Sequence, residues 1–176
     1  MLGCPAGEVQ DQVGSLFRQK AFEGMQVQNP LGIGFTLSLA LLLKRFCPSS
    51  GYDFHTEEAI GQDVCVGLKD APRRASDIVV TRAGDEVAII SAKWSVRHDR
   101  LKDLLEECEY FRVVRPSVDF YVATNEYMPA RLRKLLVNRC IEDTFHVNRS
   151  LLMLANGGNN RLAGVRDLSE LFTRFH

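Results

Sequence analysis

The sequence predicts an α/β domain in which a mixed central β-sheet is flanked by α-helices. Two short runs of β-branched residues, at 78–80 and 87–90, lie between segments whose apolar residues recur at helical spacing. The predicted order of helix, strand, strand, helix, strand and helix is typical of helices that cover the faces of one sheet. We expect a single domain, because the length of the chain suits one ordinary core. Its expected parts are N-terminal helices at 1–60, a central core at 61–130 and a C-terminal strand and helix part at 131–176, so that the domain spans 1–176.

The first third of the chain is expected to be mainly helical. In AGEVQDQVGSLFRQKAFEGM, apolar residues from Val9 to Phe22 recur at roughly helical spacing and predict an amphipathic helix. The next apolar segment, GFTLSLALLLKRF, predicts a mostly buried helix that ends at Cys47 and Pro48. The later segment CVGLKDAPRRA is expected to be a loop.

The clearest unit is a β-hairpin in SDIVVTRAGDEVAIISAKW, where Ala-Gly-Asp separates two β-branched runs. The segment DRLKDLLEECEYFRVV that follows places its apolar residues on one helical face, which predicts a helix. Four more elements are expected after it: a strand in SVDFYVATN, a short helix that begins at the proline of PARLRKLLVNRC, a small strand in DTFHVN and a closing helix in RDLSELFTRF.

Composition and charge restrict the class of protein. Lys and Arg total 22 and Asp and Glu total 22, so the formal net charge is +0. This balance argues against a protein that coats nucleic acid or membranes through bulk charge, although it leaves room for a local basic groove. The longest apolar segment is too short to span a bilayer, and the N-terminus lacks a signal pattern, so a cytoplasmic protein is expected.

The cysteines are expected to be reduced thiols. They are scattered, odd in number and without a C-x-x-C pair, which is unlike a disulfide framework or a zinc site. The five are Cys4, Cys47, Cys65, Cys108 and Cys140.

An acid and a lysine stand at the ends of the hairpin. Asp77 opens the first strand and Lys93 ends the second, so the hairpin brings both to the same edge of the sheet. A carboxylate can hold a divalent cation, and a lysine can orient an attacking water or steady a charged phosphate. The alternative is an ordinary salt bridge beside a hairpin. When these two residues are considered alone, the salt bridge is the favoured interpretation.

A Mg²⁺ site on this edge calls for a further acid. Ser91 occupies the position where a second strand acid would be convenient, so the acid is expected from the next helix. At about 100° per residue, Glu106 points away from the apolar face, whereas Glu107 and Glu109 border it on opposite sides. Because Glu107 shares its side with Arg100, it is the best candidate.

The start of that helix carries an Arg-x-Asp-Arg motif at 97–100, here called the reader segment. Arginine donates to guanine O6 and N7, and aspartate accepts from cytosine N4, so Arg97, Asp99 and Arg100 are candidates for base recognition. Taken alone, the motif is better interpreted as an acid favoured by the helix dipole, with two solvated arginines beside it. Trp94 is expected to pack in the core or at the base of the site. Candidate phosphate contacts nearby are Ser95, His98, Arg73, Arg74 and Arg82.

Taken together, SDIVV…IISAKWSVRHDRLKDLLEE resembles the PD-(D/E)xK nuclease superfamily, and within it the NgoMIV-like type II restriction endonucleases, which read sites with a CCGG core. In that group the strand carries Ser-x-Lys, and the acid lies on the next helix at the spacing that separates Lys93 from Glu107. The resemblance implies a restriction-endonuclease-like core, a catalytic site of Asp77, Lys93 and Glu107 with Mg²⁺ on the two acids, and a CCGG-reading role for the reader segment.

The resemblance also covers the N-terminal helix and the assembly. These enzymes often carry another acid on an early helix, and Asp11 stands at the corresponding place with Glu8 as an alternative, although a solvated helix face explains both. A palindromic DNA site is matched by a two-fold protein, so we expect a homodimer or higher oligomer on double-stranded DNA.

The expected function is therefore a Mg²⁺-dependent endonuclease that leaves 5′-phosphate ends. Two alternatives stay open. One is a DNA-binding or regulatory module with the nuclease fold and little or no activity. The other is a repair or mobile-element nuclease of the same superfamily.

Overall fold

A computed structural model describes residues 28–48, 51–56, 76–158 and 162–176 of the chain, and for 28–30 the backbone only. The predicted amphipathic helix between Val9 and Phe22 and the predicted loop at 65–75 lie outside these residues. So do four candidate site residues: Glu8, Asp11, Arg73 and Arg74.

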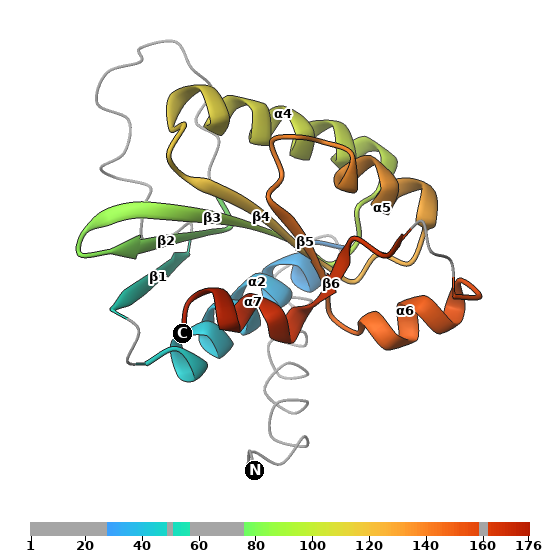
Figure 1. Ribbon diagram of the computed structural model, residues 1–176, viewed down its shortest axis with the longest axis horizontal. Coiled ribbons are helices and arrows are strands. Elements are labelled where there is room, and N and C mark those ends of the chain that lie inside the picture. Colours follow the sequence, from blue (N-terminus) through green and yellow to red (C-terminus); the bar gives the residue numbers. More distant parts are fainter. Residues whose placement is uncertain (1–27, 49–50, 57–75, 159–161) are drawn as a thin grey trace.

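The described strands form one six-stranded sheet whose strands lie side by side in sequence order (Figure 1). The strands are β1 (Tyr52–Thr56), β2 (Ile78–Arg82), β3 (Asp85–Lys93), β4 (Asp119–Thr124), β5 (Asp143–His146) and β6 (Val165–Asp167). The pairs β1–β2 and β2–β3 are antiparallel, and the three later pairs are parallel. The predicted mixed sheet is therefore confirmed, with β1 and β6 as strands that the sequence did not predict.

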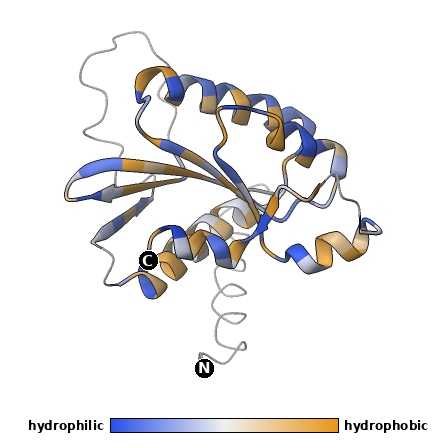
Figure 2. Cartoon of the chain, in the orientation of Figure 1, coloured by the Kyte–Doolittle hydropathy of each residue, from blue (hydrophilic) through white to orange (hydrophobic). Residues whose placement is uncertain are grey.

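Helices cover both faces of the sheet, with α4 and α5 on one face and α2 and α7 on the other (Figure 1). The described helices are α2 (Gln28–Phe46), α4 (His98–Val114), α5 (Pro129–Leu136), α6 (Arg149–Ala155) and α7 (Leu168–Arg174). Hydrophobic and hydrophilic residues alternate along α4, as expected for a helix with one buried face (Figure 2). Among the described helices, none has the length and apolarity that a membrane crossing requires.

The alternation of side chains along the hairpin divides the core between the two faces. Ile78 and Ile90 belong to the cluster beneath α2, whereas Val79 and Ile89 belong to the cluster beneath α4. Because successive strand residues point to opposite faces, Asp77 has the direction of Val79 and lies on the α4 face. The strands β2 and β3 are joined by a two-residue turn whose residues both have positive φ, as a tight hairpin requires.

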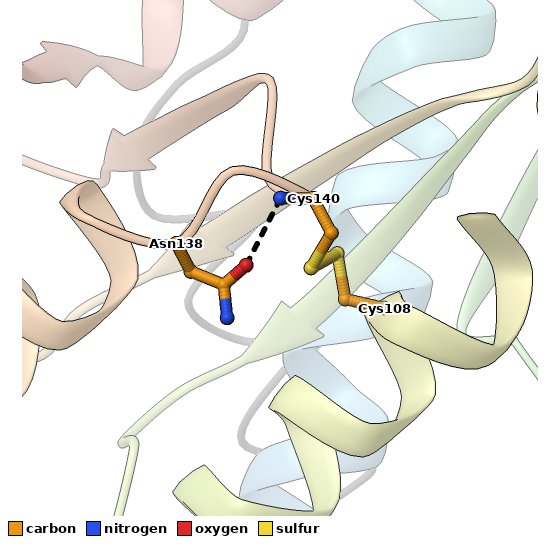
Figure 3. Close-up of a disulfide and its surroundings, with 3 residues drawn as sticks. All are labelled: Cys108, Asn138 and Cys140. Atoms are coloured by element: carbon orange, nitrogen blue, oxygen red, sulfur yellow. Dashed lines mark hydrogen bonds between the residues drawn. A yellow bond between two sulfur atoms is a disulfide. The ribbon is translucent and has the colours of Figure 1, made fainter.

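One disulfide corrects the expectation that all the cysteines are reduced. Cys108 of α4 is bonded to Cys140 in the segment between α5 and β5, and the Cα atoms lie 5.8 Å apart (Figure 3). Asn138 holds the turn there, because its Oδ1 accepts the N–H of Cys140 at 2.9 Å. The two cysteines are 32 residues apart in sequence, and no local spacing pattern predicts a pair so far apart. Cys47 is not part of this disulfide; it is buried, and burial raises the pKa of its thiol.

Candidate active site

The two hairpin ends meet as the sequence predicts. Lys93 Nζ lies 2.6 Å from Asp77 Oδ2, and the side chains are 24% and 17% exposed. The same oxygen accepts the backbone N–H of Ala92 at 2.8 Å and the hydroxyl of Ser91 at 3.2 Å. Strand β3 therefore supplies three donors to one oxygen of the carboxylate directly before β2, which fixes the acid against the lysine.

This arrangement leaves part of the carboxylate available. All three hydrogen bonds end on Oδ2, and no described residue donates one to Oδ1 of Asp77. Within the described ranges, no three His, Cys, Asp or Glu residues gather as a metal-binding group. Mg²⁺ needs only one or two protein carboxylates when phosphate oxygens and waters complete its shell, so Asp77 fits as one such ligand.

A cavity of about 760 Å³ opens beside the pair. Leu31, Ile33 and Leu37 of α2 form an apolar wall, and Thr56 at the end of β1 contributes a hydroxyl. Gly32 and Thr36 of α2 also line it, and the hairpin edge and the start of α4 contribute Asp77, Ala92, Lys93, Trp94, Ser95, Arg97 and Arg100. Among the described lining residues there are three cations and one carboxylate, so this part of the cavity suits an anion such as a phosphodiester.

Two residues of the reader segment, Arg97 and Arg100, line this cavity. Arg97 stands at the N-cap position of α4, and its Nε lies 3.3 Å from Asp99 Oδ1, with the two side chains 52% and 62% exposed. Desolvation opposes ionisation of Asp99, but the backbone N–H groups of the helix start and the charge of Arg97 together outweigh it and lower the pKa of Asp99. Asp99 is therefore an acceptor at neutral pH. His98 is exposed, and neither His98 nor Asp99 lines the cavity.

Glu107 has a different environment from the other predicted catalytic residues. It is 9% exposed and lies among the buried residues of α4, the helix that covers the face on which Asp77 lies. It does not line the cavity. Its assignment to the metal site stays a prediction.

One aromatic ring lines the cavity, and a second packs against it. Trp94 is 38% exposed and meets the ring of Phe35 edge to face, with centroids 5.6 Å apart. It lines the cavity and is not part of the core, so the expected packing in the core is wrong. Phe35 belongs to α2, a helix that the sequence predicts but does not connect with the site.

Glu126 is a buried acid that the sequence interpretation missed. Its side chain is 4% exposed and accepts hydrogen bonds from Ser95, Val96, Met128 and Arg131. The hydroxyl of Ser95, predicted as a phosphate contact, thus donates within the protein. A sequence signal existed, because Glu126 lies in the short segment between the end of β4 at Thr124 and the helix that begins at Pro129.

Comparison with known proteins supports the fold alone. No family model and no curated protein matches the sequence. A similar solved structure is that of the restriction endonuclease PspGI in complex with substrate DNA, with a TM-score of 0.61 and 13% identity over 89% of this chain. The chain spans 64% of the length of that enzyme chain. The likeness confirms the predicted restriction-endonuclease-like fold.

Proposed function

We propose that the chain is a Mg²⁺-dependent DNA endonuclease that cleaves double-stranded DNA at sites with a CCGG core and leaves 5′-phosphate ends. The main support is the contact of Lys93 with Asp77 at 2.6 Å on the wall of a cavity that also contains Arg97 and Arg100. The fold that carries this site is shared with a restriction endonuclease whose structure contains its substrate DNA.

The residues of the pair have distinct roles in this proposal. Asp77, together with Glu107, would hold Mg²⁺, which supplies Lewis-acid charge to the attacked phosphate when bound. Lys93 would turn partly away from Asp77 Oδ2, orient the attacking water and stabilise the negative charge on an oxygen of the attacked phosphate. Ser91 and the backbone of Ala92 would keep Asp77 in place during this exchange, because both donors belong to the rigid strand β3.

The reader segment would select the site. Arg97 and Arg100 would donate to guanine edges, and the ionised Asp99 would accept from cytosine N4, so that the inner base pairs of CCGG are read in the major groove. A palindromic core places two such segments in two-fold symmetry, so the active form is a homodimer or a higher oligomer.

One observation favours a second candidate, a DNA-binding module that does not cut. Asp77 is the single carboxylate that the described residues bring to the cavity. A module of this kind would keep the cationic cavity and the reader segment but lack a complete metal site. Cleavage by the wild type separates the two candidates.

Two short duplexes test the proposal, one with a CCGG core and one with the same composition and a GGCC core. We expect the wild type to cut the CCGG duplex with Mg²⁺ and to leave it intact in EDTA. Lys93→Ala should bind this duplex without cutting it, and Arg97→Ala should lose about 1–3 kcal/mol of its preference for it. Equal cutting of both duplexes would refute the CCGG assignment, and selective binding without cutting would favour the module.

A further inference from the structure

The carboxylate of Glu126 joins three segments of the chain. Oε2 accepts the hydroxyl of Ser95 and the backbone N–H of Val96, each at 3.1 Å, and the guanidinium of Arg131 at 2.9 Å. Oε1 accepts the backbone N–H of Met128 at 2.9 Å. These contacts connect the turn after β3, the segment after β4 and the first turns of α5.

The turn held by Glu126 is the one that separates the catalytic pair from the reader segment. Lys93 is the last residue of β3, and Val96 lies directly before Arg97. The parallel pairing of β3 and β4 continues for one bond past the strand ends, because Asn125 N–H donates to the carbonyl of Trp94 at 3.1 Å. Beyond that bond, Glu126 holds both Ser95 and Val96.

The chemistry of this site requires a carboxylate. All four partners are donors, and an ionised carboxylate is an acceptor through both oxygens. A glutamine of the same shape must turn its NH₂ group either toward the N–H of Met128 or toward the donors at Oε2. Either orientation sets donor against donor, so Glu126→Gln cannot keep the full set of contacts.

We propose that Glu126 is a positioning residue for base recognition, because it holds the turn that sets Arg97 and Arg100 relative to the Asp77–Lys93 pair. This inference rests on the proposed function. Glu126 would touch neither DNA nor metal. Its effect would pass through the main chain at Val96 and through the side chain of Ser95.

The readout is a selectivity ratio, defined as kcat/KM on the CCGG duplex divided by kcat/KM on a duplex with one inner base pair exchanged. In Glu126→Gln we expect this ratio to fall about tenfold, comparable with the loss of one base contact. A merely structural role would lower the active fraction equally on both duplexes and leave the ratio unchanged. The matched control is Glu86→Gln, which removes an ion pair with Arg115 at the far end of α4 and should keep the wild-type ratio.

The possible failures are distinguishable. A wild type that does not discriminate between the duplexes refutes the proposed function. A discriminating wild type with an equally discriminating Glu126→Gln overturns only the inference about Glu126. If Glu126→Gln does not fold, Arg131→Met removes one partly exposed donor from the same carboxylate and should lower the ratio in the same direction. An unchanged ratio in Arg131→Met then overturns the inference.

Discussion

The contact between Asp77 and Lys93 predicts a measurable coupling energy in the free protein. Lys93→Met keeps the aliphatic stem and removes the ammonium, and Asp77→Asn keeps an oxygen that can accept the N–H of Ala92. A hydrogen bond between charged groups contributes about 1.5–3 kcal/mol, and an exposed ion pair about 0–1 kcal/mol. With side chains 24% and 17% exposed, the pair lies between these cases. We therefore expect a coupling of about 1–2 kcal/mol.

Urea unfolding of the wild type, the two single variants and the double variant at neutral pH in EDTA gives this coupling directly. The matched control is Lys102 with Glu106, a pair 3.6 Å apart on the exposed face of α4, for which about 0.3–0.5 kcal/mol is expected. A coupling for Asp77 and Lys93 no larger than that of the control would refute the reasoning. It would mean that the 2.6 Å contact does not hold the acid against the lysine in solution.

Three further predictions concern the effects of Mg²⁺, low pH and a reducing agent on the stability of the fold. Mg²⁺ at about tenfold excess over its dissociation constant should stabilise the wild type by about 1.4 kcal/mol without DNA, or roughly 3–6 °C in Tm. Asp77→Asn should show no such shift, and a wild type that Mg²⁺ leaves unchanged would contradict the metal assignment. Burial opposes ionisation of Glu126, but Met128, Arg131 and other donors outweigh it and lower its pKa below the ordinary 4.5. The stabilisation is therefore complete above that value and is lost as pH falls through the folded pKa. The wild type should exceed Glu126→Gln in unfolding free energy at pH 7, and this excess should shrink as the pH falls below 4.5. An excess that stays constant into acid would contradict this cause. Reducing the disulfide, whose cysteines are 32 residues apart, should lower the free energy of unfolding by about 3–4 kcal/mol, and equal unfolding curves with and without reductant would exclude the bond.

The long, strongly patterned elements could be predicted from the sequence. The hairpin at β2 and β3 follows from β-branched runs around Ala83 and Gly84, and α4 follows from its apolar stripe. The missed elements carry too few patterned residues: β1 buries only Phe54 fully, and β6 has three residues. Short elements of this kind are held by their neighbours in the sheet and have little local signal.

The candidate site likewise has a part that could be predicted from the sequence and a part that could not. The meeting of Asp77 and Lys93 could be predicted because hairpin geometry alone brings strand ends together. The apolar wall from α2 and the bonds of Glu126 to Val96 could not, because both depend on contacts between segments that are distant in sequence. The Cys108 disulfide depends on the same kind of contact, since α4 and the segment after α5 meet only in the folded domain.

The most direct test of the central claim is to digest unmethylated phage DNA with the wild type and to sequence the fragment ends. The proposed function predicts discrete fragments with Mg²⁺, ends that lie at CCGG cores, and intact DNA in EDTA or with Lys93→Ala. Intact DNA in every lane, or fragments whose ends share no CCGG core, would contradict it.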